Sequence, residues 1–206
     1  MDYSTLNPET LRALTALYAK MSKVRTAHAV LMSLAVVFWF PLGVVLLRLL
    51  KVKNTVRWHA IWQSFGLVLL IAGFGLGCWV SRKAGSSMES HVILGTILFV
   101  LFLIMPIIGS FHHRSFVSKG TRDYKRHIHV WGGRIILVLG FINGGTGLKL
   151  SEAGNAGYIT YGVLSGIIGV LYVGVWYLKV RRAQTAIAGE ETELRESANE
   201  GPQISK

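Results

Sequence analysis

The chain contains a single cysteine, Cys78, among 206 residues. This scarcity excludes an internal disulfide framework and any cysteine-rich metal or iron–sulfur site. Charged residues are also few, at 16%, against 51% hydrophobic residues, so the composition is not that of a disordered chain. Acidic residues number 10 against 22 Lys and Arg, and this excess of +12 lies between hydrophobic blocks without an aromatic-interleaved patch. We therefore expect a membrane protein with no nucleic-acid partner.

Long apolar windows dominate the chain. A helix needs about 20 apolar residues to cross a hydrocarbon core of about 30 Å. Four windows contain no Asp, Glu, Lys or Arg, namely 29–47, 60–80, 92–111 and 153–178. A fifth window, 135–148, is short and must extend back through Arg134 to about His129. The sequence predicts an all-α membrane protein with five transmembrane helices at about 26–50, 58–80, 91–111, 128–149 and 156–180, the first four forming a four-helix bundle.

The two ends differ from this apolar domain, which we place at residues 25–182. Residues 1–24 carry charged groups where the apolar region of a signal peptide would lie, so we expect the first span to insert uncleaved. Asn7-Pro8-Glu9 is typical of a helix start, and apolar residues then share one face, which predicts an interfacial helix. Residues 183–206 hold five glutamates without apolar periodicity. They are predicted to form a disordered cytoplasmic tail.

Basic residues between the spans predict the orientation. The loops on one side carry 12 Lys and Arg and those on the other side carry seven. Because Lys and Arg are retained on the cytoplasmic side, the N-terminus is expected outside the cytoplasm and the C-terminus inside it. We expect an integral, multi-pass protein of the plasma membrane or an endomembrane.

Four histidines recur at one place in the pattern. His28, His59, His91 and His129 each lie near the start of one of the first four spans, at intervals of 31, 32 and 38 residues. Since successive spans are antiparallel, His28 pairs with His91 near one side of the membrane and His59 pairs with His129 near the other. Two opposed imidazoles at each of two depths are the ligands of bis-histidine haem iron, which favours electron transfer. Two such irons would lie on the order of 20 Å apart.

Other interpretations of these residues are open. A histidine at the end of a span is often an interfacial polar residue. A histidine-lined proton or metal path would need polar residues between the two layers, where Gln63 and Asn143 are the main exceptions to an apolar sequence. A membrane scaffold without chemistry is the third alternative. Glycines in the second and fourth spans leave room for flat cofactors, although close helix packing explains them as well: Gly73, Gly75, Gly77, Gly132, Gly133, Gly140, Gly144, Gly145 and Gly147.

These segments resemble the cytochrome b561 family, over about residues 20–182. The resemblance rests on Arg25-Thr-Ala-His28, Arg57-Trp-His59, Ser90-His91-Val-Ile-Leu-Gly95 and His129-Val-Trp-Gly-Gly133-Arg134. It is greatest for the five-span domains that follow an extracellular DOMON domain in ferric-chelate-reductase-like proteins. The resemblance implies two b-type haems and electron transfer from cytosolic ascorbate to ferric iron or monodehydroascorbate outside.

The resemblance also implies roles for individual residues. The four histidines match the axial ligands, and His129 is favoured over His127 because the family's fourth ligand precedes a glycine, here Gly133, by four residues. The family's cytosolic basic motif is matched by Arg48, Lys51 and Lys53, which are candidates for binding the donor, although anchoring at the cytoplasmic surface explains them equally. Arg134 is a candidate partner for a haem propionate.

Partners follow less directly. The 206 residues show no DOMON domain, so we expect either a separate extracellular redox domain as a partner or a shortened relative of the family. The small-residue faces are compatible with a homodimer. The cluster His112-His113-Arg114 is expected to be a solvated loop end rather than a metal site.

Overall fold

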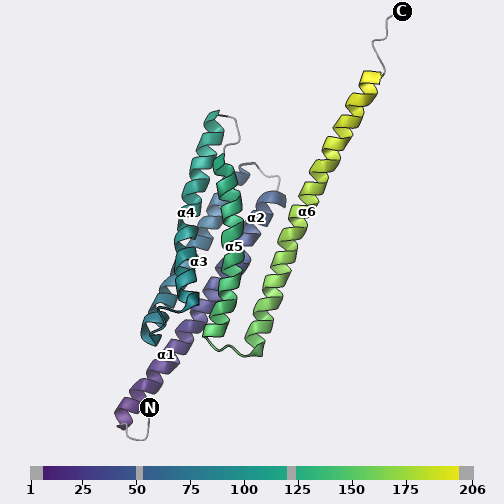
Figure 1. The fold of residues 1–206 in the computed structure, drawn as a ribbon. Coiled ribbons are helices and arrows are strands. Elements are labelled where there is room, and N and C mark those ends of the chain that lie inside the picture. Colours follow the sequence, from purple (N-terminus) through teal and green to yellow (C-terminus); the bar gives the residue numbers. More distant parts are fainter. Residues whose placement is uncertain (1–6, 50–52, 120–123, 200–206) are drawn as a thin grey trace, which may run out of the picture.

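Long helices run back and forth along a common axis in the computed structural model, which describes residues 7–49, 53–119 and 124–199 (Figure 1). The first helical segment is continuous and comprises α1 (Pro8–Ser33), a π-helical stretch η2 (Leu34–Trp39) and α2 (Phe40–Leu49). The others are α3 (Thr55–Ala84), α4 (Ser90–Lys119), α5 (Tyr124–Leu150) and α6 (Asn155–Asn199). No strand occurs among the described residues. Five helical segments of this part of the chain are long and apolar enough to cross a membrane, which confirms the predicted all-α membrane protein with five transmembrane helices.

The helix ends follow local sequence signals. The side chain of Asn7 accepts a hydrogen bond of 2.7 Å from the main-chain N–H of Glu9, and Pro8 occupies the first turn of α1. Proline is favoured there because its missing N–H would have no helical partner. The helix α3 ends at Gly85, whose φ of 68° is readily adopted by glycine. That turn allows α4 to begin five residues later and to run back beside α3.

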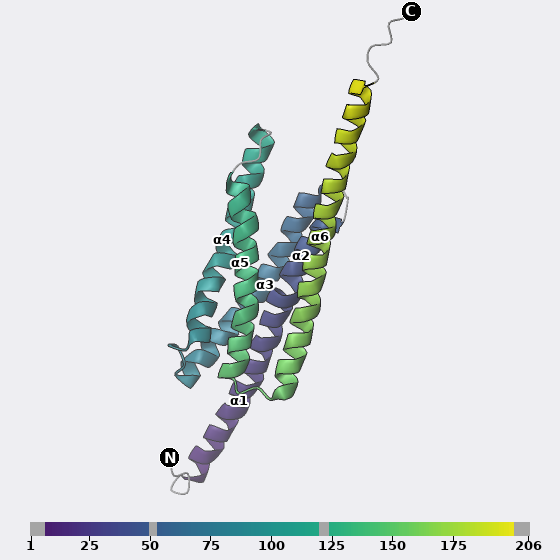
Figure 2. The same ribbon diagram turned by 45° about the vertical axis from the view of Figure 1, so that its right-hand side comes forward.

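The first four spans form a bundle of two closely packed helix pairs. The α1 segment packs chiefly on α3, and α4 packs chiefly on α5, while contacts between the two pairs are sparser (Figure 2). The diagonals of the bundle are therefore α1 to α4 and α3 to α5. A core of apolar side chains fills its middle, with Phe40 and Phe102 stacked at 4.8 Å between ring centres. Its buried members are Ala35, Val36, Phe40, Leu70, Leu98, Phe102 and Ile136.

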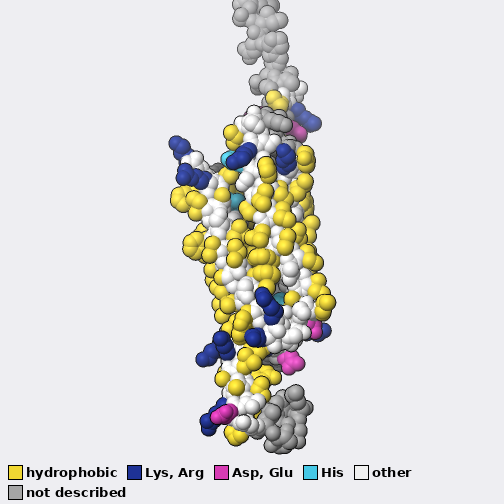
Figure 3. Space-filling model, turned by 90° about the vertical axis from the view of Figure 1, so that its left-hand side faces the viewer, with side chains coloured by type: hydrophobic (Ala, Val, Ile, Leu, Met, Phe, Trp, Pro, Cys, Tyr) yellow, Lys and Arg dark blue, Asp and Glu magenta, His cyan; other side chains and the backbone are white. Residues whose placement is uncertain are grey.

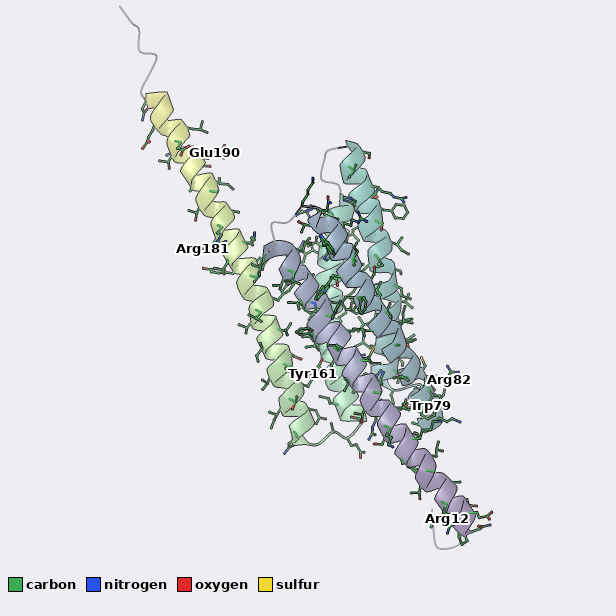
Figure 4. All side chains as sticks on the ribbon, turned by 180° about the vertical axis from the view of Figure 1, so that it is seen from behind. Arg12, Trp79, Arg82, Tyr161, Arg181 and Glu190 are labelled. Atoms are coloured by element: carbon green, nitrogen blue, oxygen red, sulfur yellow. The ribbon has the colours of Figure 1, made fainter. Side chains whose placement is uncertain are left out.

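The outer surface of the bundle is apolar, and charged side chains gather at its two ends. The face in Figure 3 carries a broad hydrophobic band, with Lys and Arg above and below it. Arg12, Trp79 and Arg82 lie toward one end of the molecule, and Arg181 and Glu190 lie toward the other (Figure 4). This distribution is what a multi-pass membrane protein requires, because lipid tails solvate the middle and water solvates the ends.

The π-helical stretch η2 brings two tryptophans together. The indole N–H of Trp39 donates to the main-chain oxygen of Trp62 at 2.7 Å, and that of Trp62 donates to the oxygen of Trp39 at 3.0 Å. Their rings stack at 4.2 Å with planes 13° apart. This reciprocal clamp fixes the C-terminal half of the first span against α3, one turn from His59.

The two terminal segments differ from the sequence prediction. Residues 8–24 do not form a separate interfacial helix but are the first turns of α1, which projects beyond the bundle. Where the sequence predicts a disordered tail from residue 183, α6 continues to Asn199 with exposed side chains. The physical reason is that residues 183–199 are rich in Ala and Glu, which have high helix propensity, and contain no proline. Glu191 also precedes Arg195 by four residues, the spacing that supports a helix.

Candidate functional site

Two histidines from opposite corners of the bundle meet at one end of it. His28 on α1 and His91 on α4 are partly buried, and their ring centres lie 6.1 Å apart with planes at 83°. The two helices lie on a diagonal of the bundle, so the imidazoles extend inward toward the axis. The structure therefore brings together the first pair of predicted site residues.

Each ring of this pair is oriented by a main-chain carbonyl of a neighbouring helix. His28 Nδ1 lies 2.8 Å from the oxygen of Gly73 on α3, and His91 Nδ1 lies 2.9 Å from the oxygen of Asn143 on α5. Since a carbonyl only accepts hydrogen bonds, each Nδ1 carries the hydrogen and each Nε2 keeps its lone pair. Such a bond is the usual means by which a protein fixes a metal-ligating imidazole.

The spacing of this pair fits a metal ion between the two rings. With metal–nitrogen bonds of about 2 Å and a ring centre about 1.2 Å behind each nitrogen, two axial imidazoles would have centres about 6 Å apart. The observed 6.1 Å agrees with that value. Among the described residues, no group of three or more His, Cys, Asp or Glu could hold a metal ion by itself. The donor set therefore suits a cofactor that supplies its own equatorial ligands, as haem does.

The second pair lies toward the other end of the bundle. His59 on α3 and His129 on α5 are partly buried and close enough to interact electrostatically. His59 Nδ1 lies 3.4 Å from the oxygen of Gly43 on α2. A cavity of about 330 Å³ opens beside His59 and is lined by Gly43, Leu46, Leu47, Thr55, Trp58, His59 and Trp62. This second pair thus lies across the other diagonal and next to open space.

Glycines form the seats of three histidine rings. A Cβ atom at Gly77 would lie 2.6 Å from Cε1 of His28, one at Gly147 would lie 2.7 Å from that of His91, and one at Gly109 would lie 2.9 Å from that of His129. Real Cβ atoms essentially never approach so closely, so any larger residue would displace the ring. These glycines make room for the imidazoles rather than for a flat cofactor directly.

The seats are reciprocal within each helix pair. The first span carries His28 and supplies the Gly43 oxygen to His59, while α3 carries His59 and seats His28. In the same way, α4 carries His91 and seats His129, while α5 carries His129 and seats His91. Each tightly packed helix pair therefore orients one imidazole of each histidine pair. The partner imidazole comes from the other half of the bundle.

The remaining predicted residues lie around the second pair. His127 is exposed, whereas His129 is partly buried and faces Gly109. The Arg134 guanidinium lies 4.6 Å from the centre of the Trp131 ring, and its Nε is buried without a hydrogen-bond partner among the described residues. A buried donor of this kind in a membrane span is costly unless another group accepts its hydrogen.

The candidate donor-binding residues are only partly covered by the structure. Lys53 is exposed just before α3. Lys51 and the side chain of Arg48 lie outside the described residues. The structure accordingly leaves this set as a prediction.

Several residues that shape the site are not evident in the sequence pattern. Gly43 and Gly109 are single glycines in apolar runs, and nothing local distinguishes them from packing glycines. Asn143 could be recognised from the sequence, because a polar side chain in the middle of an apolar span has a high free-energy cost in lipid. In the structure it is 7% exposed. Its neighbour Thr146 has no such signal, since threonine is common in transmembrane helices.

The fold and the histidine pairs define a class: a multi-pass integral membrane protein with two pairs of partly buried histidines in a helical bundle. No protein-family model matches the chain, and no solved structure matches it. A cytochrome b561 and DOMON domain-containing protein of Arabidopsis thaliana is 26% identical over 170 residues, which cover 81% of this chain and 42% of that relative. The chain thus spans less than half of the relative's length. This similarity supports the cytochrome b561 family at a distant level.

Proposed function

We propose that the chain is a transmembrane oxidoreductase that carries electrons through two b-type haems, one held by His28 and His91 and the other by His59 and His129. The observation that carries this proposal is the first pair, with ring centres at 6.1 Å and both Nδ1 atoms oriented by main-chain oxygens. Haem iron with two axial imidazoles exchanges single electrons and has no open position for oxygen. The distant relative's name supports the same function at the level of the family.

The protein's own residues hold and insulate the two centres. The Nδ1 bonds of His28 and His91 fix the two rings and leave each Nε2 lone pair free to bind a metal, which lowers the cost of ordering a bound group. The apolar core between the pairs excludes water, with Phe40 and Phe102 stacked at its centre. From His28 to Gly43, which lies at the level of His59, there are 15 residues, or roughly 20 Å of helix. That separation between the two histidine pairs suits electron transfer across the membrane.

The remaining assignments extend the proposal to substrates. Arg48, Lys51 and Lys53 would attract an anionic cytosolic donor such as ascorbate. Arg134, with its buried Nε, would donate to a propionate of the second haem. The acceptor beyond His28 and His91 would be ferric iron or monodehydroascorbate, reached directly or through a separate extracellular redox domain. In this proposal the N-terminus lies outside the cytoplasm and the C-terminus inside it, and the small-residue faces allow two copies of the chain to form a homodimer.

An absorption spectrum tests the cofactor first. Membranes containing the chain are reduced with ascorbate or dithionite, and haem is quantified per polypeptide. Two haems per chain, largely reducible by ascorbate, support both the centres and the donor. Reduction by dithionite alone supports the centres and rejects ascorbate. Well-folded protein without haem refutes the proposal.

Ligand variants then assign the centres. His28→Ala and His91→Ala should each lose one haem and keep the other. His113→Ala is a matched control, because its side chain is exposed near the C-terminal end of α4. Loss of no haem from either ligand variant would favour a membrane scaffold or a transporter.

A further inference from the structure

A small polar network on α5 surrounds the Nδ1 atom of His91. The hydroxyl Oγ1 of Thr146 lies 2.8 Å from the main-chain oxygen of Asn143, 3.0 Å from the side-chain Oδ1 of the same residue and 3.4 Å from His91 Nδ1. His91 Nδ1 itself lies 2.9 Å from the main-chain oxygen of Asn143. Asn143 is 7% exposed, so this network is closed off from the lipid.

One oxygen is shared between two donors in this network. The main-chain oxygen of Asn143 accepts from His91 Nδ1–H, and the Thr146 hydroxyl is directed at the same atom. The hydroxyl has one hydrogen and two acceptors within reach, the main-chain oxygen and Oδ1. The Asn143 side chain therefore offers the hydroxyl a second acceptor at 3.0 Å, and whenever the hydroxyl donates to it the main-chain oxygen is left to His91.

We infer that Asn143 and Thr146 are positioning residues that set the strength of the His91 hydrogen bond and, through it, the midpoint potential of the centre at His28 and His91. The inference rests on the proposed function. A stronger bond from Nδ1–H makes the imidazole a better electron donor to a metal at Nε2. Better donation stabilises the oxidised metal and lowers the midpoint potential, because second-shell hydrogen bonds tune haem centres in this way.

The shared oxygen gives two substitutions opposite effects. In Asn143→Leu the hydroxyl loses Oδ1 and turns fully onto the main-chain oxygen, so the His91 bond weakens and the potential of that haem rises. In Thr146→Val the competing hydroxyl is gone, so the His91 bond strengthens and the potential falls. Thr146→Ser keeps the hydroxyl and should restore the wild-type value.

The experiment is a redox titration of the purified, full-length protein, followed by absorption and electron paramagnetic resonance, with haem per chain measured for every variant. Thr96→Val is the matched control, because the Thr96 hydroxyl on α4 bonds only its own helix at Val92 and its side chain is exposed. Its potentials should equal those of the wild type. The haem at His59 and His129 should keep its potential in every variant.

The outcomes separate this inference from the proposed function. Opposite shifts of one haem, with the Thr146→Ser value restored, support the inference. Shifts in the same direction, or none, in variants that retain two haems overturn it and leave the proposed function standing. If Asn143→Leu does not retain haem, the test rests on the two Thr146 variants. A midpoint potential that falls in Thr146→Val and stays at the wild-type value in Thr146→Ser then supports the inference. Any other result overturns it. Wild-type protein without haem refutes the proposed function itself.

Discussion

Gly77 on α3 lies so close to the imidazole of His28 on α1 that a Cβ atom there would be 2.6 Å from Cε1 of the ring. The contact joins a glycine and a histidine that are 49 positions apart in the chain. It means that a helix carrying one ligand also defines where another ligand can point. The predictions below use such contacts between the spans.

Gly77→Ala should displace the His28 ring and lose the haem of the first pair. The measurement is haem per chain, expected to fall from two toward one. Gly75→Ala is the matched control on the same helix, because a Cβ atom at Gly75 meets no atom within 4 Å. Alanine in a helix is otherwise favoured over glycine by about 1 kcal/mol, so a loss in Gly77→Ala alone points to the contact. Equal haem content in both variants would contradict the claim that Gly77 leaves the space occupied by the His28 ring.

His129→Ala should lose the second haem, and His127→Ala should keep both. The reason is that His129 is partly buried and faces Gly109, whereas His127 is exposed two residues nearer the start of α5. Reduced-minus-oxidised spectra of the two variants, prepared in parallel, decide the matter. The reverse pattern would make His127 the ligand.

Trp62→Phe should destabilise the folded protein by about 1 kcal/mol or somewhat less, the usual net value of one lost hydrogen bond. The substitution keeps an aromatic ring for stacking on Trp39 but removes the N–H that donates to the Trp39 oxygen. Thermal unfolding in detergent measures the effect. Trp58→Phe is the control, as Trp58 is 62% exposed. Equal thermal stability of Trp62→Phe and Trp58→Phe would show that the hydrogen bond from Trp62 to Trp39 does not stabilise the fold.

Tyr161→Phe should loosen α6 from the bundle. The Tyr161 hydroxyl donates to the main-chain oxygen of Phe141 on α5 at 2.8 Å, and its ring fills the notch at Gly144. Limited proteolysis in the loop between α5 and α6 should become faster than in the wild type. Tyr158→Phe, one turn earlier on α6 and 42% exposed, should behave as the wild type. Equal cleavage of both variants would show that α6 is held by other contacts.

A cysteine at Ser87 should react with a membrane-impermeant maleimide from outside intact cells, and one at Ala188 only after permeabilisation. The asymmetry of 12 against seven basic residues in the loops predicts this orientation. The background is Cys78→Ser, which removes the single native cysteine. Both sites are exposed in the structure. If only Ala188→Cys reacts in intact cells, the orientation is the opposite of the predicted one, with the C-terminus outside.

The sequence by itself determined the five spans, because hydrocarbon thickness demands runs of about 20 apolar residues and nothing else in a chain of this size needs them. It also determined the alternation that sends His28 and His91 to one end and His59 and His129 toward the other, since antiparallel spans follow from short loops. Arg134 and Asn143 were detectable because polar groups in such spans are costly.

Only the tertiary structure decided which helices are neighbours and which are diagonal. Because α1 packs on α3 and α4 packs on α5, His28 and His91 lie opposite each other across the bundle axis. No local sequence pattern encodes that choice of neighbours. The glycine seats, the shared oxygen of Asn143 and the tryptophan clamp depend on contacts between residues 20 to 56 positions apart. Such contacts are set by the fit of side chains between helices, which a linear sequence does not display.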